Sequence, residues 1–328
     1  FYFNSIKIMK YITLGKTNEK VSIIGLGSWS YGKENISNGS SVGWAGQSDS
    51  DSISALKKSF SLGINHWDTA DVYGEGYSEK IIGSLWKELP RAEIFLATKI
   101  GWDMGPYKNW YNPKHMRTNF EKSLINLKTD CVDLLYLHHC NFGKLDEYLD
   151  DAVDTINRFK EEGKTKFIGL SDWSSSRILK FIEIVKPDVI QPLYNVYDRD
   201  YIISGLNNYV NNNNIGVCYF SPIKHGLLTG KYESIPTFPK GDFRENVKEF
   251  KNSDFINKMQ TNKIKLEEKF SSISKEPVLH GLTSSILFDN PTACVLLGQR
   301  NQQQAICASK LGQPMSKKES EWVFSLYN

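Results

Sequence analysis

The chain contains 328 residues, of which 40% are apolar, and its 40 basic and 37 acidic side chains give a formal charge of +3. This length fits one large domain or two smaller ones, and the apolar content is enough for a large buried core. Charges of both signs are scattered along the chain, which argues against nucleic-acid or membrane-surface binding, and no segment approaches the roughly 18 apolar residues of a membrane span.

The N-terminal end and the cysteines give two further expectations. Residues 1–8 precede Met9 and are too short and too polar for a signal peptide, so we interpret them as an upstream or vector-derived extension. The five cysteines form no Cys-x-x-Cys pair, and an odd number of dispersed thiols is typical of a reducing compartment. We therefore expect a cytoplasmic protein, and we predict no metal site.

From Met9 onward, strand-like and helix-like segments alternate without a linker or an internal repeat longer than this unit. Residues 10–14 and 20–24 alternate enough to form a hairpin. Apolar runs follow near residues 23–28, 65–70, 94–99, 132–138, 167–171, 188–193, 215–221 and 293–297. Eight such runs with intervening helices predict one α/β domain over residues 9–328, a parallel (β/α)8 barrel.

Helical periodicity is clearest in two segments between these runs. Ile53, Leu56 and Phe60 recur after a start at Asp49, and a second stripe of Phe120, Leu124 and Leu127 follows Pro113. We interpret both stripes as packing surfaces rather than binding sites.

Three successive strand-like runs end in residues that can handle protons. Asp68 ends the first, Lys99 the second and His138 the third, while Tyr73 follows Asp68 just before a Gly-x-Gly turn and a predicted helix start near Tyr77. The ends of parallel strands lie on one face, where α/β folds place ligands. Each residue alone also has a structural interpretation, as a turn cap, a surface charge or a hydrogen-bonded histidine. Their coincidence favours a site.

A tyrosine needs help to act as an acid, because its unperturbed pKa is about 10. A nearby cation stabilises the tyrosinate and brings that pKa toward neutrality. The sequence therefore predicts that Tyr73 and Lys99 lie close together.

This constellation resembles the aldo-keto reductase superfamily, in particular its bacterial-type members with longer loops. The resemblance continues through Ile168 to Asp172, Gln191 to Asn195, Phe220 to Pro222 and Leu227 to Tyr232. It implies that the N-terminal hairpin closes the bottom of the barrel. It also implies an NAD(P)H-dependent oxidoreductase that reduces a carbonyl to an alcohol: Tyr73 donates the proton, Lys99 held by Asp68 lowers the pKa of Tyr73, and His138 orients the carbonyl.

The resemblance also implies a set of cofactor-binding residues, although no Gly-x-Gly-x-x-Gly fingerprint is present. Ser171, Asp172 in place of the commoner Asn, and Gln191 hold the carboxamide, and Phe220 in place of Tyr stacks on the nicotinamide. The remaining members of the set are Gly27, Ser28, Trp29, Ser221, Lys231, Gly298, Arg300 and Gln304. Arg300 either pairs with a 2′-phosphate or is a solvated charge, and we expect NADP(H) to be preferred over NAD(H).

Four long connections, at residues 30–48, 101–112, 140–145 and 223–254, extend the loops where barrel chemistry occurs. Aromatic side chains in or near them could stack on a sugar or enclose an apolar carbonyl compound, or could simply pack the loops. The substrate candidates are Trp29, Trp44, Trp102, Trp110 and Arg244, the last of which either meets a substrate anion or pins its loop to Asp242.

Two alternatives to a reductase stay open. The chain could be a nicotinamide-binding regulatory or redox-sensing subunit with little turnover, or a dehydrogenase working mainly toward oxidation. In each case the partner is a small molecule, and neither the substrate nor the oligomeric state follows from the sequence.

Overall fold

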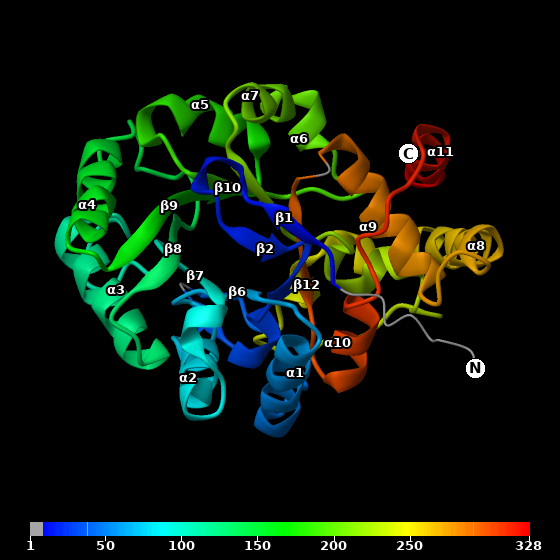
Figure 1. Cartoon of the computed structure of the whole chain (residues 1–328), viewed down its shortest axis with the longest axis horizontal. Coiled ribbons are helices and arrows are strands. Elements are labelled where there is room, and N and C mark those ends of the chain that lie inside the picture. Colours follow the sequence, from blue (N-terminus) through cyan, green and yellow to red (C-terminus); the bar gives the residue numbers. More distant parts are fainter. Residues whose placement is uncertain (1–8, 38, 291) are drawn as a thin grey trace.

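The computed structural model describes residues 9–37, 39–290 and 292–328. A closed barrel of eight parallel strands lies at its centre, inside a ring of helices (Figure 1). In sequence order the barrel strands are β3 (Ile24–Gly27), β6 (His66–Asp68), β7 (Phe95–Ile100), β8 (Val132–Leu137), β9 (Thr165–Asp172), β10 (Val189–Pro192), β11 (Gly216–Tyr219) and β12 (Cys294–Gly298). The predicted fold class is confirmed.

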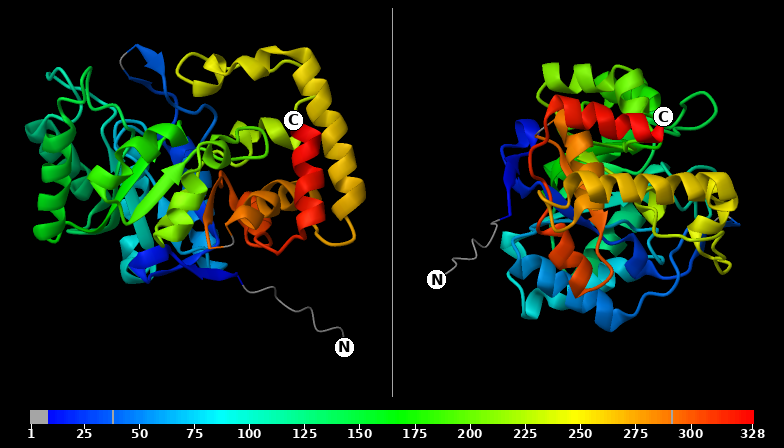
Figure 2. Two further views of the ribbon diagram at one scale, coloured as in Figure 1. Left: turned by 90° about the horizontal axis from the view of Figure 1, so that it is seen from above. Right: turned by 90° about the vertical axis from the view of Figure 1, so that its right-hand side faces the viewer.

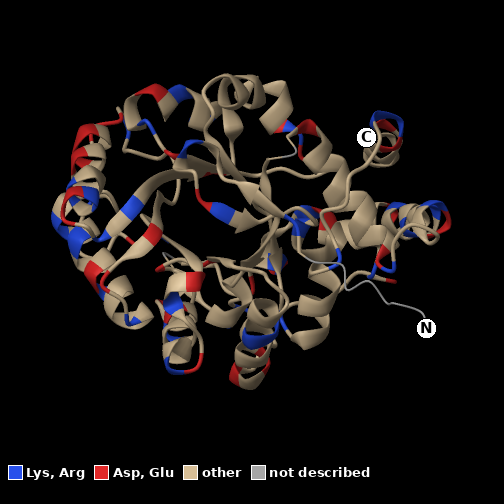
Figure 3. Ribbon diagram, in the orientation of Figure 1, with Lys and Arg blue, Asp and Glu red and all other residues tan. Residues whose placement is uncertain are grey.

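The barrel forms because its strands are buried on both faces. Every residue of β7 and β8 is buried, as expected for continuous apolar runs in a parallel sheet. The surrounding α-helices are α1 (Asp49–Ser61), α2 (Tyr77–Gly83), α3 (Pro113–Leu127), α4 (Leu149–Glu161), α5 (Ser175–Val185), α6 (Asp200–Ile203), α7 (Leu206–Asn212), α8 (Ser253–Phe270), α9 (Pro277–Asp289), α10 (Gln302–Ala308) and α11 (Lys317–Tyr327). Charges of both signs are interspersed around this ring (Figure 3).

The two predicted helical stripes are packing surfaces. In α1, Leu56 is fully buried and Ile53 and Phe60 pack against the core, and in α3, Phe120 and Leu127 are fully buried. Both helices begin with a side-chain cap, because Ser48 accepts from the Asp51 amide and Asn112 from the Lys114 amide.

The predicted N-terminal hairpin consists of β1 (Tyr11–Thr13) and β2 (Lys20–Ser22), paired antiparallel. It lies across the centre of the barrel in Figure 1. Its turn docks at the start of β11, where the Lys16 amide donates to the Asn214 carbonyl at 2.7 Å. Gly15 has φ +51°, and a Cβ there would lie only 2.3 Å from the Gly216 nitrogen. The hairpin therefore covers the N-terminal end of the barrel. The predicted extension, residues 1–8, lies outside the described residues.

Two long loops rise from the opposite side of the barrel from this hairpin, as the left view of Figure 2 shows. The first contains the short strands β4 (Ile36–Ser37) and β5 (Ser40–Ser41), and the second contains the 3₁₀ helices η6 (Phe243–Asn246) and η7 (Lys248–Lys251). They join at Gly43, whose carbonyl accepts from the Phe243 amide at 3.0 Å, and at Ala45, whose amide donates to Asp242 at 2.8 Å. The two loops are therefore joined to each other by hydrogen bonds at this end of the barrel.

All five cysteines are free thiols. Within the described part of the chain, no helix is long and apolar enough to cross a membrane.

Candidate active site

The Asp68, Tyr73 and Lys99 side chains meet in the interior of the barrel's C-terminal end. The Lys99 ammonium lies 2.5 Å from Asp68 Oδ1 and 2.8 Å from the Thr69 carbonyl, and it donates to the Tyr73 hydroxyl at 3.3 Å. Lys99 and Asp68 are 1% and 3% exposed, so this ion pair is screened little by water. One ammonium therefore links a carboxylate to a phenol.

Gln191 holds the other oxygen of Asp68. Its amide nitrogen donates to Asp68 Oδ2 at 2.9 Å, from the end of β10. The backbone of Asp68 is fixed as well, because the Ser28 hydroxyl donates to its carbonyl at 2.8 Å. The carboxylate therefore has a donor on each oxygen, as a buried charge requires.

The pKa of Tyr73 departs from the sequence-based expectation. Burial raises the pKa of Tyr73 above its usual value, while the positive charge of Lys99 acts to lower it. The effect of Lys99 has the predicted sign, but desolvation of the phenolate outweighs it. Tyr73 is therefore protonated at neutral pH, the form in which it can donate.

His138 and Trp29 both contact the Tyr73 ring. The His138 ring meets Tyr73 edge to face at 6.1 Å between centroids, whereas Trp29 stacks on Tyr73 at 5.9 Å. Burial, together with the charge of Lys99 and the neighbouring His139, holds the pKa of His138 well below its usual range. A neutral imidazole can hydrogen-bond a carbonyl but is a poor proton source, whereas the protonated Tyr73 hydroxyl still carries a proton.

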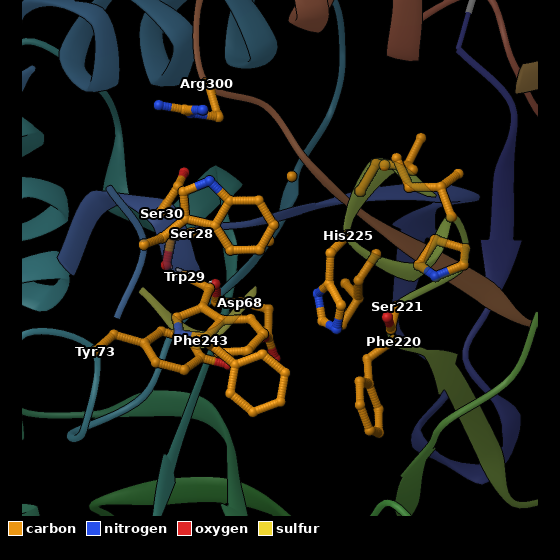
Figure 4. Close-up of a pocket in the computed structure, with 18 of the residues that line it drawn as sticks. Ser28, Trp29, Ser30, Asp68, Tyr73, Phe220, Ser221, His225, Phe243 and Arg300 are labelled. Atoms are coloured by element: carbon orange, nitrogen blue, oxygen red, sulfur yellow. Dashed lines mark hydrogen bonds between the residues drawn. The ribbon is translucent and has the colours of Figure 1, made fainter. Parts of the chain in front are cut away.

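A cavity of about 370 Å³ opens above these residues, and Asp68, Tyr73 and His138 line it. Figure 4 shows Tyr73, Asp68 and Phe243 gathered in one part of the cavity and Arg300 at a distance from them. The wall near Tyr73 is mostly apolar and aromatic, and it consists of Trp29, Val42, Trp44, Val72, Trp102, Trp173 and Phe243.

The residues predicted to bind the cofactor all line this same cavity. They are Gly27, Ser28, Trp29, Ser171, Asp172, Gln191, Phe220, Ser221, Lys231, Gly298, Arg300 and Gln304. They come from β3 and the residues that follow it, β9, β10, the segment after β11, and β12 with the following helix. The fold therefore brings together in space a set that spans most of the sequence.

Several of these polar groups already have protein partners. The Asp172 carboxylate accepts from the Cys140 amide at 2.7 Å and the Ser174 amide at 2.8 Å. The Ser171 hydroxyl donates to the Gln191 carbonyl at 2.9 Å. In contrast, the hydroxyls of Ser30 and Ser221 line the cavity without a hydrogen-bond partner among the described residues. Such buried, unpaired groups are uncommon and suit a ligand.

Arg300 is more constrained than a solvated charge. Its Nε donates to Gln47 at 2.8 Å, and one terminal nitrogen donates to the Ala45 carbonyl at 3.1 Å and to the Gly46 carbonyl. The guanidinium thereby ties the first of the two long loops, here called the cover loop, to the end of β12. Its other terminal nitrogen has no hydrogen-bond partner among the described residues and keeps donors for an anion.

Two substrate candidates, Trp110 and Arg244, are not among the residues that line the cavity. Trp110 donates to the Asn141 carbonyl at 2.8 Å and packs against His139. Arg244 forms a bidentate pair with Asp242, at 2.9 Å from Nε and 2.6 Å from a terminal nitrogen, and its guanidinium lies 4.3 Å from the Trp44 ring centroid. This geometry matches the loop-pinning alternative for Arg244. Trp29, Trp44 and Trp102 do line the cavity.

Three aromatic residues that line the cavity were not among the predicted candidates. Trp173 directly follows the predicted Ser-Asp pair, Phe243 lies between Asp242 and Arg244, and His225 lies in a turn at φ +59°. The His225 ring contacts Trp29, Trp44 and Phe243 at centroid distances of 5.6, 5.7 and 5.3 Å. Trp173 and Phe243 could have been found from their neighbours in sequence. His225 could not have been found in this way, because it lies in an irregular turn that has neither helical nor strand periodicity in the sequence.

Comparison with known proteins agrees with this geometry. The sequence profile of the Aldo/keto reductase family matches residues 23–305. The chain is 28% identical to L-glyceraldehyde 3-phosphate reductase of Escherichia coli over 90% of this chain and 85% of that protein. It is 31% identical to an NADH-specific methylglyoxal reductase of the same species over 68% of this chain and 70% of that protein. The fold of a glycerol dehydrogenase from Gluconobacter oxydans superposes with a TM-score of 0.77 at 24% identity, covering 98% of this chain and 95% of that one.

Proposed function

Because the chain belongs to the aldo/keto reductase family of oxidoreductases, which perform NAD(P)H-dependent carbonyl reduction, we propose that it reduces neutral carbonyl compounds with Tyr73 as the proton donor. The observation that carries this proposal is the contact of Tyr73 with the Lys99 ammonium at 3.3 Å, inside a cavity and beside a neutral His138.

Each residue of the site has a separate role in the proposed reduction. When bound, a reduced nicotinamide would supply the hydride that the carbonyl carbon receives. Negative charge then develops on the carbonyl oxygen, and Tyr73 neutralises it with its proton while Lys99 stabilises the tyrosinate that remains. Asp68, held by Gln191, fixes Lys99 in place. His138 orients the carbonyl through a neutral ring nitrogen.

The cavity suits a nicotinamide dinucleotide along one side. Phe220 offers an aromatic face, and the unpaired Ser221 and Ser30 hydroxyls offer donors for phosphate oxygens. Among the described lining residues, Lys231 and Arg300 are the cations. We assign Arg300 to the 2′-phosphate and therefore propose NADP(H), although one relative is named as NADH-specific.

The wall beside Tyr73 favours an uncharged substrate. It is built from indole and phenyl rings, and the nearby guanidinium of Arg244 is neutralised by Asp242. A phosphate placed there would lose its hydration without gaining a cation, which is costly. The Trp44 indole nitrogen has no hydrogen-bond partner among the described residues, so it offers a donor to a hydroxyl or a second carbonyl oxygen.

The test is a panel of neutral aldehydes, ketones and sugars together with phosphate esters of the same carbonyl compounds. Consumption of NADPH and of NADH is followed over many turnovers. We expect sustained turnover, with kcat/KM at least about 10-fold higher for the neutral member of each pair. Equal or better use of the esters would contradict the substrate class. Tight cofactor binding without repeated turnover would instead favour a regulatory subunit.

A further inference from the structure

A second cluster of chemically active side chains lies inside the barrel and outside the catalytic cavity. We propose that His66, Cys218 and Cys294 form a structural metal site for a soft divalent cation, Zn²⁺ being the best match. Their ligand atoms all lie within 4.8 Å of one another, and each of the three residues is 0% exposed. None of them lines the catalytic cavity. This proposal reverses our sequence-based prediction of no metal site.

Strand register explains why three residues so distant in sequence meet. Cys218 and Cys294 are direct partners in the parallel pair of β11 and β12. His66 comes from β6, and β3 lies between β6 and β12. The position of β3 at this level is Gly25, where an added Cβ would lie 3.1 Å from Cys294 Sγ and 2.7 Å from a Leu296 methyl carbon. The missing side chain at Gly25 leaves room in the barrel for the imidazole and the thiols.

The imidazole of His66 is the observation that points to a ligand. Neither of its ring nitrogens has a hydrogen-bond partner among the residues that the structure describes, although the residue is fully buried. The ring packs edge to face on Phe95, with centroids 5.1 Å apart. An unsatisfied buried donor or acceptor costs about 1–3 kcal/mol. A metal bound to one nitrogen removes part of that cost.

The ligand set determines the kind of ion. Two thiolates and a neutral imidazole form a soft set that selects zinc over magnesium or calcium. The two thiol protons leave to solvent on loading, so the charges of the ion and the thiolates cancel and the complex is neutral in an apolar core. Tetrahedral zinc separates its sulfur ligands by about 3.8 Å, which lies within the spacing of the cluster. The Ser22 carbonyl accepts a hydrogen bond from the Cys294 thiol at 3.4 Å, so its oxygen is close enough to take the fourth position once the thiol proton has left.

Such a site ties β6, β11 and β12 together from the inside. Because the barrel is closed and these residues are fully buried, the ion enters as the chain folds, and its binding energy becomes folding energy. The proposal does not depend on the reductase activity.

The experiment refolds the full chain from denaturant under reducing conditions with Zn²⁺, with Co²⁺ or with a chelator, followed by gel filtration. We expect about one zinc per chain by elemental analysis, and a Co²⁺ form with intense sulfur-to-cobalt charge-transfer absorption in the near ultraviolet. The zinc form should melt at least several degrees above the chelator-treated form.

Variants locate the ion. Cys294→Ser and His66→Phe should each abolish stoichiometric binding, whereas Cys131→Ser, which removes a partly exposed thiol outside the cluster, should retain it. The zinc content of the wild-type chain tests the proposal even if a core variant fails to fold. A folded wild-type chain that holds less than about one-tenth equivalent of zinc overturns the proposal. Full occupancy in a folded Cys294→Ser variant also overturns it, because the ion then lies elsewhere.

Discussion

The amide of Gln191 donates to Asp68 Oδ2 at 2.9 Å, from a strand 123 positions further along the chain. Lys99 holds the other oxygen of the same carboxylate. Gln191 therefore helps to fix the Asp68–Lys99 ion pair, in addition to lining the cavity. We therefore predict that Gln191 has a role in holding Asp68 that can be separated from cofactor binding.

Gln191→Ala should leave Asp68 with one donor fewer in a buried site. A hydrogen bond to a charged group contributes about 1.5–3 kcal/mol, so we expect a loss of stability of that order. The kcat of carbonyl reduction should fall about 10-fold or more, because Lys99 is then less firmly held. Denaturant unfolding and separate measurements of kcat and cofactor Kd check this. A change in Kd with kcat unchanged would assign Gln191 to the cofactor alone.

Lys99→Met should be the most damaging change to the ion pair. It leaves a buried carboxylate without its cation, which costs about 3–5 kcal/mol in comparable sites. It also removes the charge that stabilises the tyrosinate, so turnover at neutral pH should fall by about 100-fold or more. Turnover near the wild-type value would reject the assigned role of Lys99.

The double variant Asp68→Asn with Lys99→Met separates the two effects of that change. It leaves no uncompensated charge, so it should recover stability in denaturant unfolding without recovering activity. Recovery of activity with stability would mean that Lys99 acts only as a structural ion-pair partner.

We expect His139 to make the stability of the protein depend on pH. Burial, and to a lesser degree the charge of Arg177, lowers the pKa of His139 to about 3. Below an unfolded-state pKa of about 6.5 the unfolded chain binds a proton that the folded chain does not, so stability falls as pH falls, by up to about 1.4 kcal/mol per pH unit. We expect the Tm to drop between pH 7 and pH 5, and the drop to be smaller in His139→Gln. Parallel Tm profiles for the two proteins would contradict this.

Arg300→Ala should raise KM for NADPH by about 10-fold or more while changing KM for NADH little, because only NADPH carries the 2′-phosphate. Arg300 also holds the cover loop, so a matched control is needed. Gln47→Ala removes the 2.8 Å contact to Arg300 Nε but leaves the guanidinium in place. If both variants weaken both cofactors equally, Arg300 acts through the loop and the phosphate contact is wrong.

The sequence predicts the barrel and the central site for a definable reason. Parallel strands read as apolar runs, and the residues at their ends, such as Asp68, Lys99 and His138, converge because the strands share a direction. The hairpin can also be predicted, since the alternation of apolar and polar residues that indicates it lies within one short segment.

Other features could not be predicted, because they depend on opposing electrostatic effects and on irregular turns that leave no periodic pattern in the sequence. Whether Lys99 or burial dominates the pKa of Tyr73 depends on how completely the ring is desolvated. His225 reaches the cavity from a turn in which both it and Lys224 have positive φ. The His66 cluster requires the register of β11 against β12 and a glycine on β3, which only the closed barrel reveals.

The most direct test of the central claim is the rate of hydride transfer in Tyr73→Phe, followed by nicotinamide absorbance with the best neutral carbonyl substrate. The variant keeps the ring that stacks on Trp29 and removes only the hydroxyl. We predict a loss of kcat of about 100-fold to 10,000-fold, with cofactor Kd unchanged. Carbonyl reduction at the wild-type rate would show that the proton comes from another group.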